Sequence, residues 1–225
     1  APGSLDGSNT GWMLTDALYL HADWATPFEA DQTNPDEFTT AAGQKVTVPF
    51  MNGGRFHAVS LDGWTAVQLP YRGGKLAMIA LLPPAGAGGC TLPSASALGT
   101  ITTRLASPGD LIRSVALPKV NLASQVSLKD LLTKLGMGMT FTPAADFTAL
   151  SAQACCIGLV EHAATLQVGE KGTIASAATA VSVQASSAEV MARQIVFDRP
   201  YLLLVTGTAT GEPLFMARVT NPATR

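Results

Sequence analysis

Residues 169–188, GEKGTIASAATAVSVQASSA, decide how this chain is interpreted, because they combine the features of a loop with those of a strand. A charged pair, Glu170-Lys171, precedes Gly172, and the residues that follow are almost all small or β-branched, with no charge before Glu189. Composition alone allows a flexible linker rich in alanine and serine. The order of the residues is what distinguishes this stretch from such a linker.

That order is an alternation of two kinds of side chain. Every second residue from Thr173 onward is small and increasingly apolar, in the series Thr173, Ala175, Ala177, Thr179, Val181 and Val183. The intervening residues are mostly polar or very small, with Ile174 as the exception. A strand that packs one face against a core shows this period of two. The stretch is therefore predicted to be able to exist both as a mobile loop and as a strand.

Most other apolar segments also predict strands. They are Gly11–Ala22, Gln44–Phe50, Trp64–Tyr71, Lys75–Leu82, Val115–Val120, Ile157–Val168, Pro200–Val205 and Glu212–Val219. The turn residues Arg72-Gly73-Gly74 and the turn at Gly207–Gly211 predict that the flanking strands form two hairpins. Helices are expected over about Ser96–Leu105 and over Ser127–Leu135, the latter with Ser127 as N-cap and Gly136 as the left-handed stop. The sequence predicts an α+β protein that is rich in strands and has few helices.

Composition limits the classes of partner. Hydrophobic residues make up 47% of the chain and charged residues 13%, which supports a substantial core. A net charge of −2 with scattered lysines and arginines gives no reason to expect nucleic acid as a partner. The longest apolar run, Leu76–Leu82, is shorter than the ~20 residues of a membrane helix. Residues 1–10 lack the basic start and apolar stretch of a signal peptide, and a flexible tail is expected there.

Enzyme chemistry finds little support in the residue types present. The three histidines, His21, His57 and His162, show no metal-ligand spacing, and neither G-x-S-x-G nor H-E-x-x-H occurs. We therefore expect no catalytic residues, no metal and no cofactor. Adjacent cysteines rarely pair with each other, so Cys155 and Cys156 are interpreted as core-side residues at the start of a strand.

Several ordered motifs resemble those of one family, the serpins. Glu170-Lys171-Gly172-Thr173, followed by the small residues Ala175–Ala180, is similar to the serpin hinge. Further similar motifs are Leu14–Phe28, Asp146–Leu150, Val160–Ala164, Phe197–Pro200 and Pro213–Pro222. The resemblance implies that residues 11–225 are the carboxy-terminal two-thirds of a serpin, whose amino-terminal helical part is missing from this chain. It also implies an exposed reactive loop over residues 172–196.

The resemblance implies a function as a suicide-substrate inhibitor of serine proteases. In serpins the cleaved reactive loop inserts as a strand into a large sheet and traps the acyl-enzyme. From Thr173 to Ala180 the hinge carries no charge and no aromatic side chain, and no proline occurs between residues 144 and 199, which favours an inhibitory member. The alternative is a non-inhibitory serpin-fold protein that binds a partner or has a structural role. An extracellular location is expected, as for most of the family.

The scissile bond follows from counting along the loop. The family's spacing from Glu170 gives Ser186–Ser187, whereas counting back from Phe197 gives about Glu189. We prefer Ser186–Ser187, because the sheet that the hinge must fill sets the hinge length. Small residues before this bond suit an elastase-like or subtilisin-like protease.

Four further residues correspond to structural supports of the family. Trp24 matches a tryptophan beneath the place where the hinge enters the sheet, and Lys119 matches a lysine that pairs with the hinge glutamate, here Glu170. His162 matches a histidine at the centre of the sheet, and its partner is Asp16 where the family usually has asparagine. A carboxylate favours protonated histidine, so we hypothesise a pH-sensitive gate. The alternative is that both residues are only hydrogen-bonded structural groups.

Overall fold

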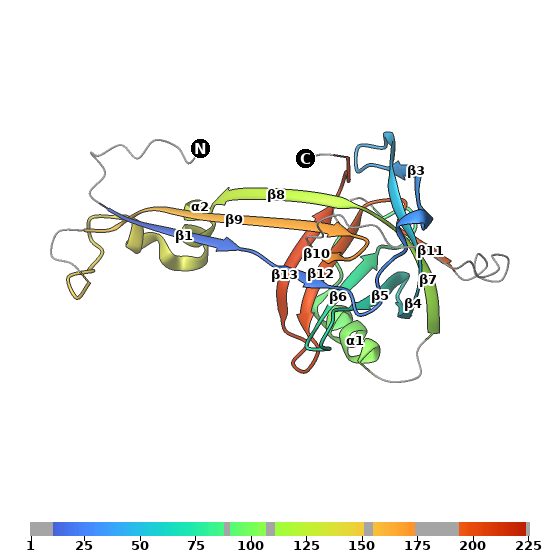
Figure 1. The fold of residues 1–225 in the computed structure, drawn as a ribbon. Coiled ribbons are helices and arrows are strands. Elements are labelled where there is room, and N and C mark those ends of the chain that lie inside the picture. Colours follow the sequence, from blue (N-terminus) through green and yellow to red (C-terminus); the bar gives the residue numbers. More distant parts are fainter. Residues whose placement is uncertain (1–10, 88–90, 107–110, 151–154, 174–193, 224–225) are drawn as a thin grey trace. The chain divides into compact units, whose positions relative to one another are not determined.

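The computed structural model describes residues 11–87, 91–106, 111–150, 155–173 and 194–223 (Figure 1). Contacts divide the chain into two compact units. The core unit comprises Leu20–Leu122 and Leu166–Arg225, and the β1 unit comprises Ala1–Tyr19 and Ala123–Thr165. The sequence did not predict this division of residues 11–225.

The core unit contains an eight-stranded, mostly antiparallel sheet. The strand order is β11 (Gln194–Val196), β7 (Leu111–Pro118), β4 (Lys45–Leu61), β5 (Trp64–Pro70), β6 (Leu76–Leu82), β12 (Tyr201–Gly207) and β13 (Pro213–Val219), with β3 (Thr33–Thr39) paired to β4. The predicted turn at Arg72-Gly73-Gly74 joins β5 to β6, and the predicted carboxy-terminal hairpin is the β12–β13 pair.

Helix α1 (Ala95–Leu105) covers part of this sheet. Ser94 caps the helix, because its side chain accepts a hydrogen bond of 3.1 Å from the Ala97 N–H. The helix and the sheet share one hydrophobic cluster. Its buried residues are Val59, Trp64, Ala66, Ile79, Leu81, Ile101, Leu105, Leu202 and Leu204. Burying one such aliphatic side chain contributes about 1.5–3 kcal/mol, so this cluster stabilises the unit that positions the hinge.

The β1 unit is built on strand pairs that involve β9 (Ile157–Gly169). Strand β1 (Trp12–Leu18) runs parallel to β9, and β8 (Val120–Ser127) also pairs with β9. Short helical turns follow β8, namely α2 (Lys129–Leu132), η2 (Thr133–Met137) and η3 (Gly138–Phe141).

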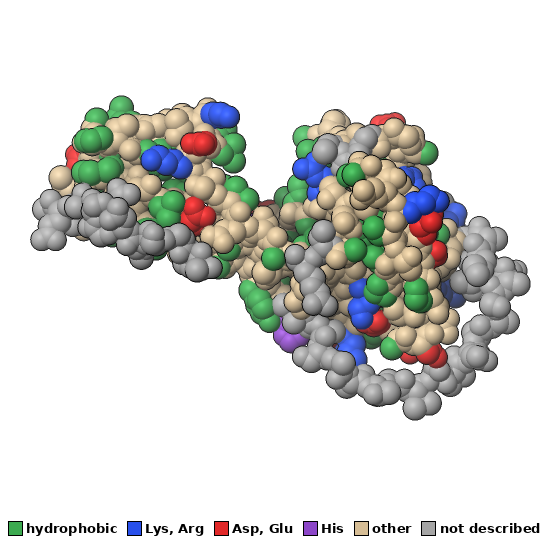
Figure 2. Space-filling view, turned by 90° about the horizontal axis from the view of Figure 1, so that it is seen from above, with side chains coloured by type: hydrophobic (Ala, Val, Ile, Leu, Met, Phe, Trp, Pro, Cys, Tyr) green, Lys and Arg blue, Asp and Glu red, His purple; other side chains and the backbone are tan. Residues whose placement is uncertain are grey.

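Apolar side chains of the β1 unit are largely uncovered. Among its described residues only Ile157 is buried. The exposed large side chains are Trp12, Met13, Leu14, Leu18, Tyr19, Val126, Leu131, Leu135, Met137, Met139 and Leu150. Figure 2 shows hydrophobic side chains in green on the surface of the unit that carries α2, at the left of that view.

Two short strands extend the sheet of β9 within the core unit. At the end of β9 the chain turns at Glu170-Lys171 and returns as β10 (Gly172–Thr173), antiparallel to β9. On its other side β10 pairs antiparallel with β2 (Ala22–Asp23), and the 3-10 turn η1 (Ala30–Gln32) follows β2 along the chain. Strand β9 therefore pairs with β1 along its first residues and with β10 at its last residues.

Several predicted bounds were wrong. The strand expected over Gly11–Ala22 is interrupted between β1 and β2, and β4 extends well past the predicted Phe50. The prediction over Val115–Val120 joined the end of β7 to the start of β8, while β3 and β11 were missed.

The prediction of a helix over Ser127–Leu135 was partly wrong, because pairing of β8 with β9 extends the strand to Ser127. Ser127 is not an N-cap, because it belongs to β8 and the next helix begins at Lys129 without a side-chain cap. Gly136 does adopt the predicted left-handed conformation, with φ of 101°, but it lies inside η2. No helix among the described residues is long and apolar enough to cross a membrane.

Candidate functional site

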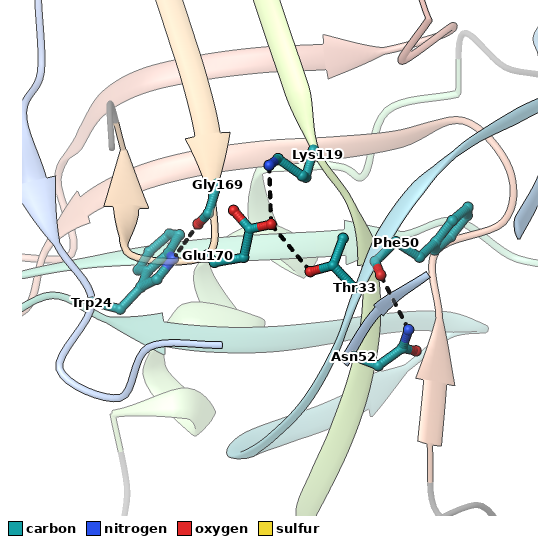
Figure 3. Close-up of polar contacts among 7 residues, drawn as sticks. All are labelled: Trp24, Thr33, Phe50, Asn52, Lys119, Gly169 and Glu170. Carbon is teal, nitrogen blue, oxygen red and sulfur yellow. Dashed lines mark hydrogen bonds and ion pairs between the residues drawn. The ribbon is translucent and has the colours of Figure 1, made fainter. Parts of the chain in front are cut away.

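The hinge lies in a polar and aromatic cluster of the core unit, and Trp24 is the largest side chain in it. Trp24 is 1% exposed, and its indole Nε1 donates a hydrogen bond of 2.9 Å to the Gly169 carbonyl (Figure 3). Its ring stacks on Tyr71, with centroids 4.6 Å apart and planes at 12°. The Trp24 N–H also donates to the Lys171 carbonyl at 2.8 Å. Trp24 therefore forms hydrogen bonds on both sides of Glu170, in the turn between β9 and β10.

Glu170 sits at this turn and accepts two side-chain hydrogen bonds. Lys119 Nζ lies 3.0 Å and Thr33 Oγ1 3.1 Å from Glu170 Oε1, as Figure 3 shows. Burial opposes ionisation of Glu170, but hydrogen bonds from its own backbone, Lys119 and Thr33, together with the lysine charge, lower the pKa of the carboxyl. The carboxylate is thus ionised and ties the turn to the start of β3 and to Lys119, the residue between β7 and β8.

Gly172 is the first residue of β10 and has no room for a side chain. A Cβ built there would lie 2.1 Å from the Ala22 carbonyl oxygen, a backbone atom of the paired strand. The glycine that the hinge motif carries is therefore required by the close approach of β2.

Thr173 is the second residue of β10 and is fully buried, at 0% exposure. Its Oγ1 lies 2.6 Å from the Tyr71 hydroxyl, so each buried hydroxyl has a partner. Burial raises the pKa of Tyr71 to about 12, while the hydrogen bond to Thr173 lowers it less. Tyr71 therefore remains neutral and links the hinge to the aromatic stack with Trp24.

These positions correct the loop bounds expected from the sequence. Gly172 and Thr173 are buried strand residues, and Gln194–Val196 form β11, so neither end of the predicted 172–196 loop is exposed. The hinge residues Ala175, Ala177 and Thr179 and the predicted reactive bond Ser186–Ser187 lie outside the described residues, as does the tail 1–10.

After residue 193 the chain again pairs with strands of the core unit. Strand β11 pairs parallel with β7, and the Phe197 N–H donates to the Ala116 carbonyl at 2.9 Å. Gln194 Nε2 donates to Asn52 Oδ1 at 3.1 Å, and Asn52 in turn donates to the Phe50 carbonyl at 3.1 Å (Figure 3). Both ends of the stretch 174–193 are thus anchored in the core unit.

Asp16 and His162 belong to the β1 unit. They are directly opposite each other on β1 and β9, and His162 Nδ1 lies 2.9 Å from Asp16 Oδ2. The His162 side chain is 34% exposed and that of Asp16 72%. The pair therefore bridges the strands β1 and β9 at a partly solvated position.

Sequence reasoning missed two residues of the cluster, Tyr71 and Thr33. The hairpin signal at Arg72-Gly73-Gly74 placed Tyr71 at the end of a strand but did not identify its partner. The structure shows that partner as Trp24, through an isolated β-bridge between the two residues. Thr33 begins β3, a strand that no pattern predicted.

The cluster offers no set of catalytic or metal-binding groups. Among the described residues, no three His, Cys, Asp or Glu side chains are grouped so that they could hold a metal ion. A cavity of about 590 Å³ beside the turn is lined by Lys119 and Glu170 as its charged residues, and these neutralise each other.

Comparison with known families and proteins gives one consistent result. The family described as Serpin (serine protease inhibitor) matches residues 2–222. Plasminogen activator inhibitor 1 of Neovison vison is 33% identical over 95% of this chain and 55% of its own length. Serpin-Z1A of Triticum aestivum is 32% identical over 98% of this chain and 58% of its length, and alpha-1-antichymotrypsin of Homo sapiens is 32% identical over 96% and 52%.

Solved structures agree with the fold. The thermophilic serpin Tengpin in its native state matches with a TM-score of 0.76 and 24% identity over 93% of this chain and 55% of its own. A serpin-12 of Manduca sexta matches with a TM-score of 0.75 and 22% identity over 95% and 57%. The chain spans only about half the length of the curated relatives it matches.

Proposed function

Because this chain belongs to the serpin family, we propose that, together with the remaining part of that fold, it is a suicide-substrate inhibitor of serine proteases. One observation carries the proposal. Gly172 and Thr173 already form a strand between β9 and β2, and the small-residue stretch of the hinge continues directly from them. This arrangement supports an insertion that begins at β10.

The reaction would begin as ordinary proteolysis. The catalytic serine of the protease attacks the carbonyl carbon of the scissile bond, for which Ser186–Ser187 is the proposed position. An ester forms between the protease serine and the residue before the cut, and the new amino terminus leaves with a proton. The hinge then has a free end that carries the protease.

Insertion would continue the strand that β10 begins. Strand β1 pairs directly with β9 from Trp12 opposite Ile157 to Leu18 opposite Ala164, so a longer inserted strand must part these two strands. About fifteen inserted residues span roughly 50 Å at ~3.3 Å each. At ~1 kcal/mol net for each new backbone hydrogen bond, the inserted strand contributes on the order of 10 kcal/mol. Displacing the donors of an oxyanion hole slows catalysis by about 10²–10³ for each one lost, so the ester persists.

The hinge composition suits this movement. Thr173 is fully buried beside Tyr71, which leaves no space or solvent for a charge. Alanine and threonine at the alternate positions from Ala175 to Thr179 leave little bulk to accommodate on the inward face. The small residues before the proposed bond favour an elastase-like or subtilisin-like protease, and action outside the cell is part of the proposal.

The chain would need the amino-terminal part of the fold for this activity. All residues of β1 are exposed, including Leu14 at 46% and Trp12 at 37%. Contiguous apolar surface of this kind is unfavourable in water unless other elements cover it. The relatives are nearly twice as long as this chain, which leaves room for such elements.

Asp16 and His162 would set how readily β1 and β9 part. A protonated His162 forms a charged pair with Asp16 across the two strands, whereas neutral histidine forms only a hydrogen bond. The rate of insertion is therefore proposed to depend on pH through this pair. Asp16→Asn should flatten the pH profile of the inhibition rate, and an unchanged profile would leave both residues with a structural role only.

Complex formation with a protease tests the proposal. The amino-terminal portion of Serpin-Z1A from Triticum aestivum is fused before Gly11, and the chimera is incubated with elastase or subtilisin. A covalent complex that survives SDS is expected. Simple cleavage without a complex would favour the non-inhibitory alternative.

A hinge variant controls for nonspecific adducts. Thr173→Arg places a charge at the buried start of the inserted strand, so the variant should be cleaved as a substrate without forming the complex. A matched change of the exposed Thr210 to Arg should leave complex formation intact. Equal complex formation by all three proteins would contradict the hinge mechanism.

A further inference from the structure

Two neighbouring thiols lie at the start of β9, away from the hinge. The Sγ atoms of Cys155 and Cys156 are 2.6 Å apart, Cys155 is exposed and Cys156 is half-buried. The prediction that both face the core is therefore wrong for Cys155, which faces solvent. We propose that this pair is a redox-sensitive dithiol that reacts with a small disulfide such as glutathione disulfide and closes reversibly to a bond between adjacent residues.

The sulfur positions make ring closure a short movement. A disulfide bond is about 2.05 Å long, so little motion separates the observed contact from a bond. Neighbouring Cα atoms are only about 3.8 Å apart, below the usual range of about 4.4–6.8 Å for disulfides. The bond would be strained, and strained, exposed disulfides are more oxidising and more easily reduced than structural ones. The constraint that disfavours a permanent bridge is what makes this one reversible.

The two thiols are not equivalent. The hydrogen bond with Cys155 is the largest cause that raises the pKa of the Cys156 thiol, followed by burial and by the charge of Cys155, while Lys129 opposes these effects. The raised pKa makes Cys156 less ready to form a thiolate, and Cys155 is the more accessible of the two sulfurs. Cys155 is the exposed, attacking sulfur and Cys156 the resolving one.

Glutathione disulfide is the only oxidant that this thiol–disulfide exchange requires. The Cys155 thiolate attacks one sulfur of glutathione disulfide and releases one glutathione thiolate, which leaves a mixed disulfide on Cys155. Cys156 then loses its proton, attacks Sγ of Cys155 and releases the second glutathione. Two protein thiols are oxidised, and one glutathione disulfide is reduced to two glutathione molecules.

The backbone links this site to the pairing of β1 and β9. The Trp12 N–H donates a hydrogen bond of 2.8 Å to the Cys156 carbonyl, directly before the β1–β9 register begins. A Cβ at Gly11 would lie 2.9 Å from the same carbonyl oxygen, so the backbone there is closely packed. The ring would contain Cα of Cys156, to which this carbonyl is attached, and oxidation is therefore expected to reorient the carbonyl and weaken the first contact between the strands.

Intact-mass measurement tests the chemistry on the chain as it stands. In a Cys90→Ser background, glutathione disulfide should remove the mass of two hydrogen atoms, and dithiothreitol should restore it. Cys156→Ser in that background should stop at the mixed disulfide, and Cys155→Ser should react more slowly than Cys156→Ser. A parent chain that accumulates only the mixed disulfide, or only dimers, would overturn the proposal.

Hydrogen exchange tests the coupling separately. The Trp12 amide should exchange several-fold faster in the oxidised chain, with no such change for β6 amides such as that of Ile79. Equal exchange of Trp12 in both redox states would show that the pair does not influence the strands and would overturn that part of the inference.

Discussion

Strands β6 and β1 differ in surroundings more than in sequence. Both have seven residues, LAMIALL in β6 and WMLTDAL in β1, and both are rich in large apolar side chains. Six residues of β6 are buried between β5, β12 and the α1 cluster, whereas every residue of β1 is exposed. The comparison shows that burial depends on neighbouring elements: β6 lies between two paired strands beneath α1, whereas the side chains of β1 have no such cover among the described residues.

The largest expected effect contrasts matched leucines on these two strands. Leu81→Ala in β6 removes a fully buried side chain and should cost about 2–5 kcal/mol of unfolding free energy. Leu14→Ala in β1 should change it by less than about 0.5 kcal/mol, because Leu14 is already solvated. Urea unfolding of both variants measures the difference. Equal losses would show that β1 is covered in solution by part of this chain or by a second copy.

The second prediction contrasts two glycines. Gly172→Ala should destabilise the protein by about 1–3 kcal/mol, since the new Cβ meets the Ala22 carbonyl oxygen and forces β10 away from β2. Gly99→Ala, on α1 with open space around it, should stabilise by about 0.5–1 kcal/mol through helix propensity. Thermal unfolding shows whether each variant is more or less stable than the parent chain. A stabilising Gly172→Ala would mean that the hinge is not seated as a strand.

The third prediction sharpens the role of Tyr71. Tyr71→Phe keeps the stack on Trp24 but leaves the buried Thr173 hydroxyl without its partner, at a cost of about 1–2 kcal/mol. The double variant Tyr71→Phe/Thr173→Val removes both hydroxyls and should recover most of this loss. A double-mutant cycle by urea unfolding measures the coupling. Strictly additive losses would show that the two hydroxyls do not interact.

The smallest expected effect is the pH dependence of the Lys119–Glu170 pair. The pKa of Glu170 is lower in the folded chain than in the unfolded chain, so its contribution is present above the unfolded value and lost as the pH falls through the folded value. Glu170→Gln should cost less than about 1 kcal/mol at neutral pH, because the pair is partly exposed. The difference from the parent should shrink on acidification, as followed by urea midpoints. A constant difference would contradict the ion pair.

Local pattern predicted the strands whose signals lie within a few residues. The β5–β6 and β12–β13 hairpins follow from apolar runs on either side of glycine-containing turns. Strand β3, TNPDEFT, was missed because six of its seven residues lie outside the core and its pairing with β4 supplies the order. The Ser127 cap failed because pairing of β8 with β9 overrode a plausible local signal.

Part of the candidate site could also be predicted from the sequence. The hinge motif located Glu170, Gly172 and Thr173, and Lys119 and Trp24 came from the family resemblance. Tyr71 and Thr33 were not predictable, because their contacts to the hinge join residues about a hundred positions apart. The alternation from Thr173 onward is compatible with both a loop and a strand, so it did not predict that Thr173 is already buried in β10.

Thermal unfolding of the chimera before and after a single cut tests the central claim most directly. The proposed insertion predicts that cleavage near Ser186–Ser187 raises the midpoint by on the order of 20 °C, because the freed hinge adds a full strand to the sheet of β9. An unchanged or lower midpoint in the cleaved protein would mean that the hinge does not insert, and the proposed function would be wrong.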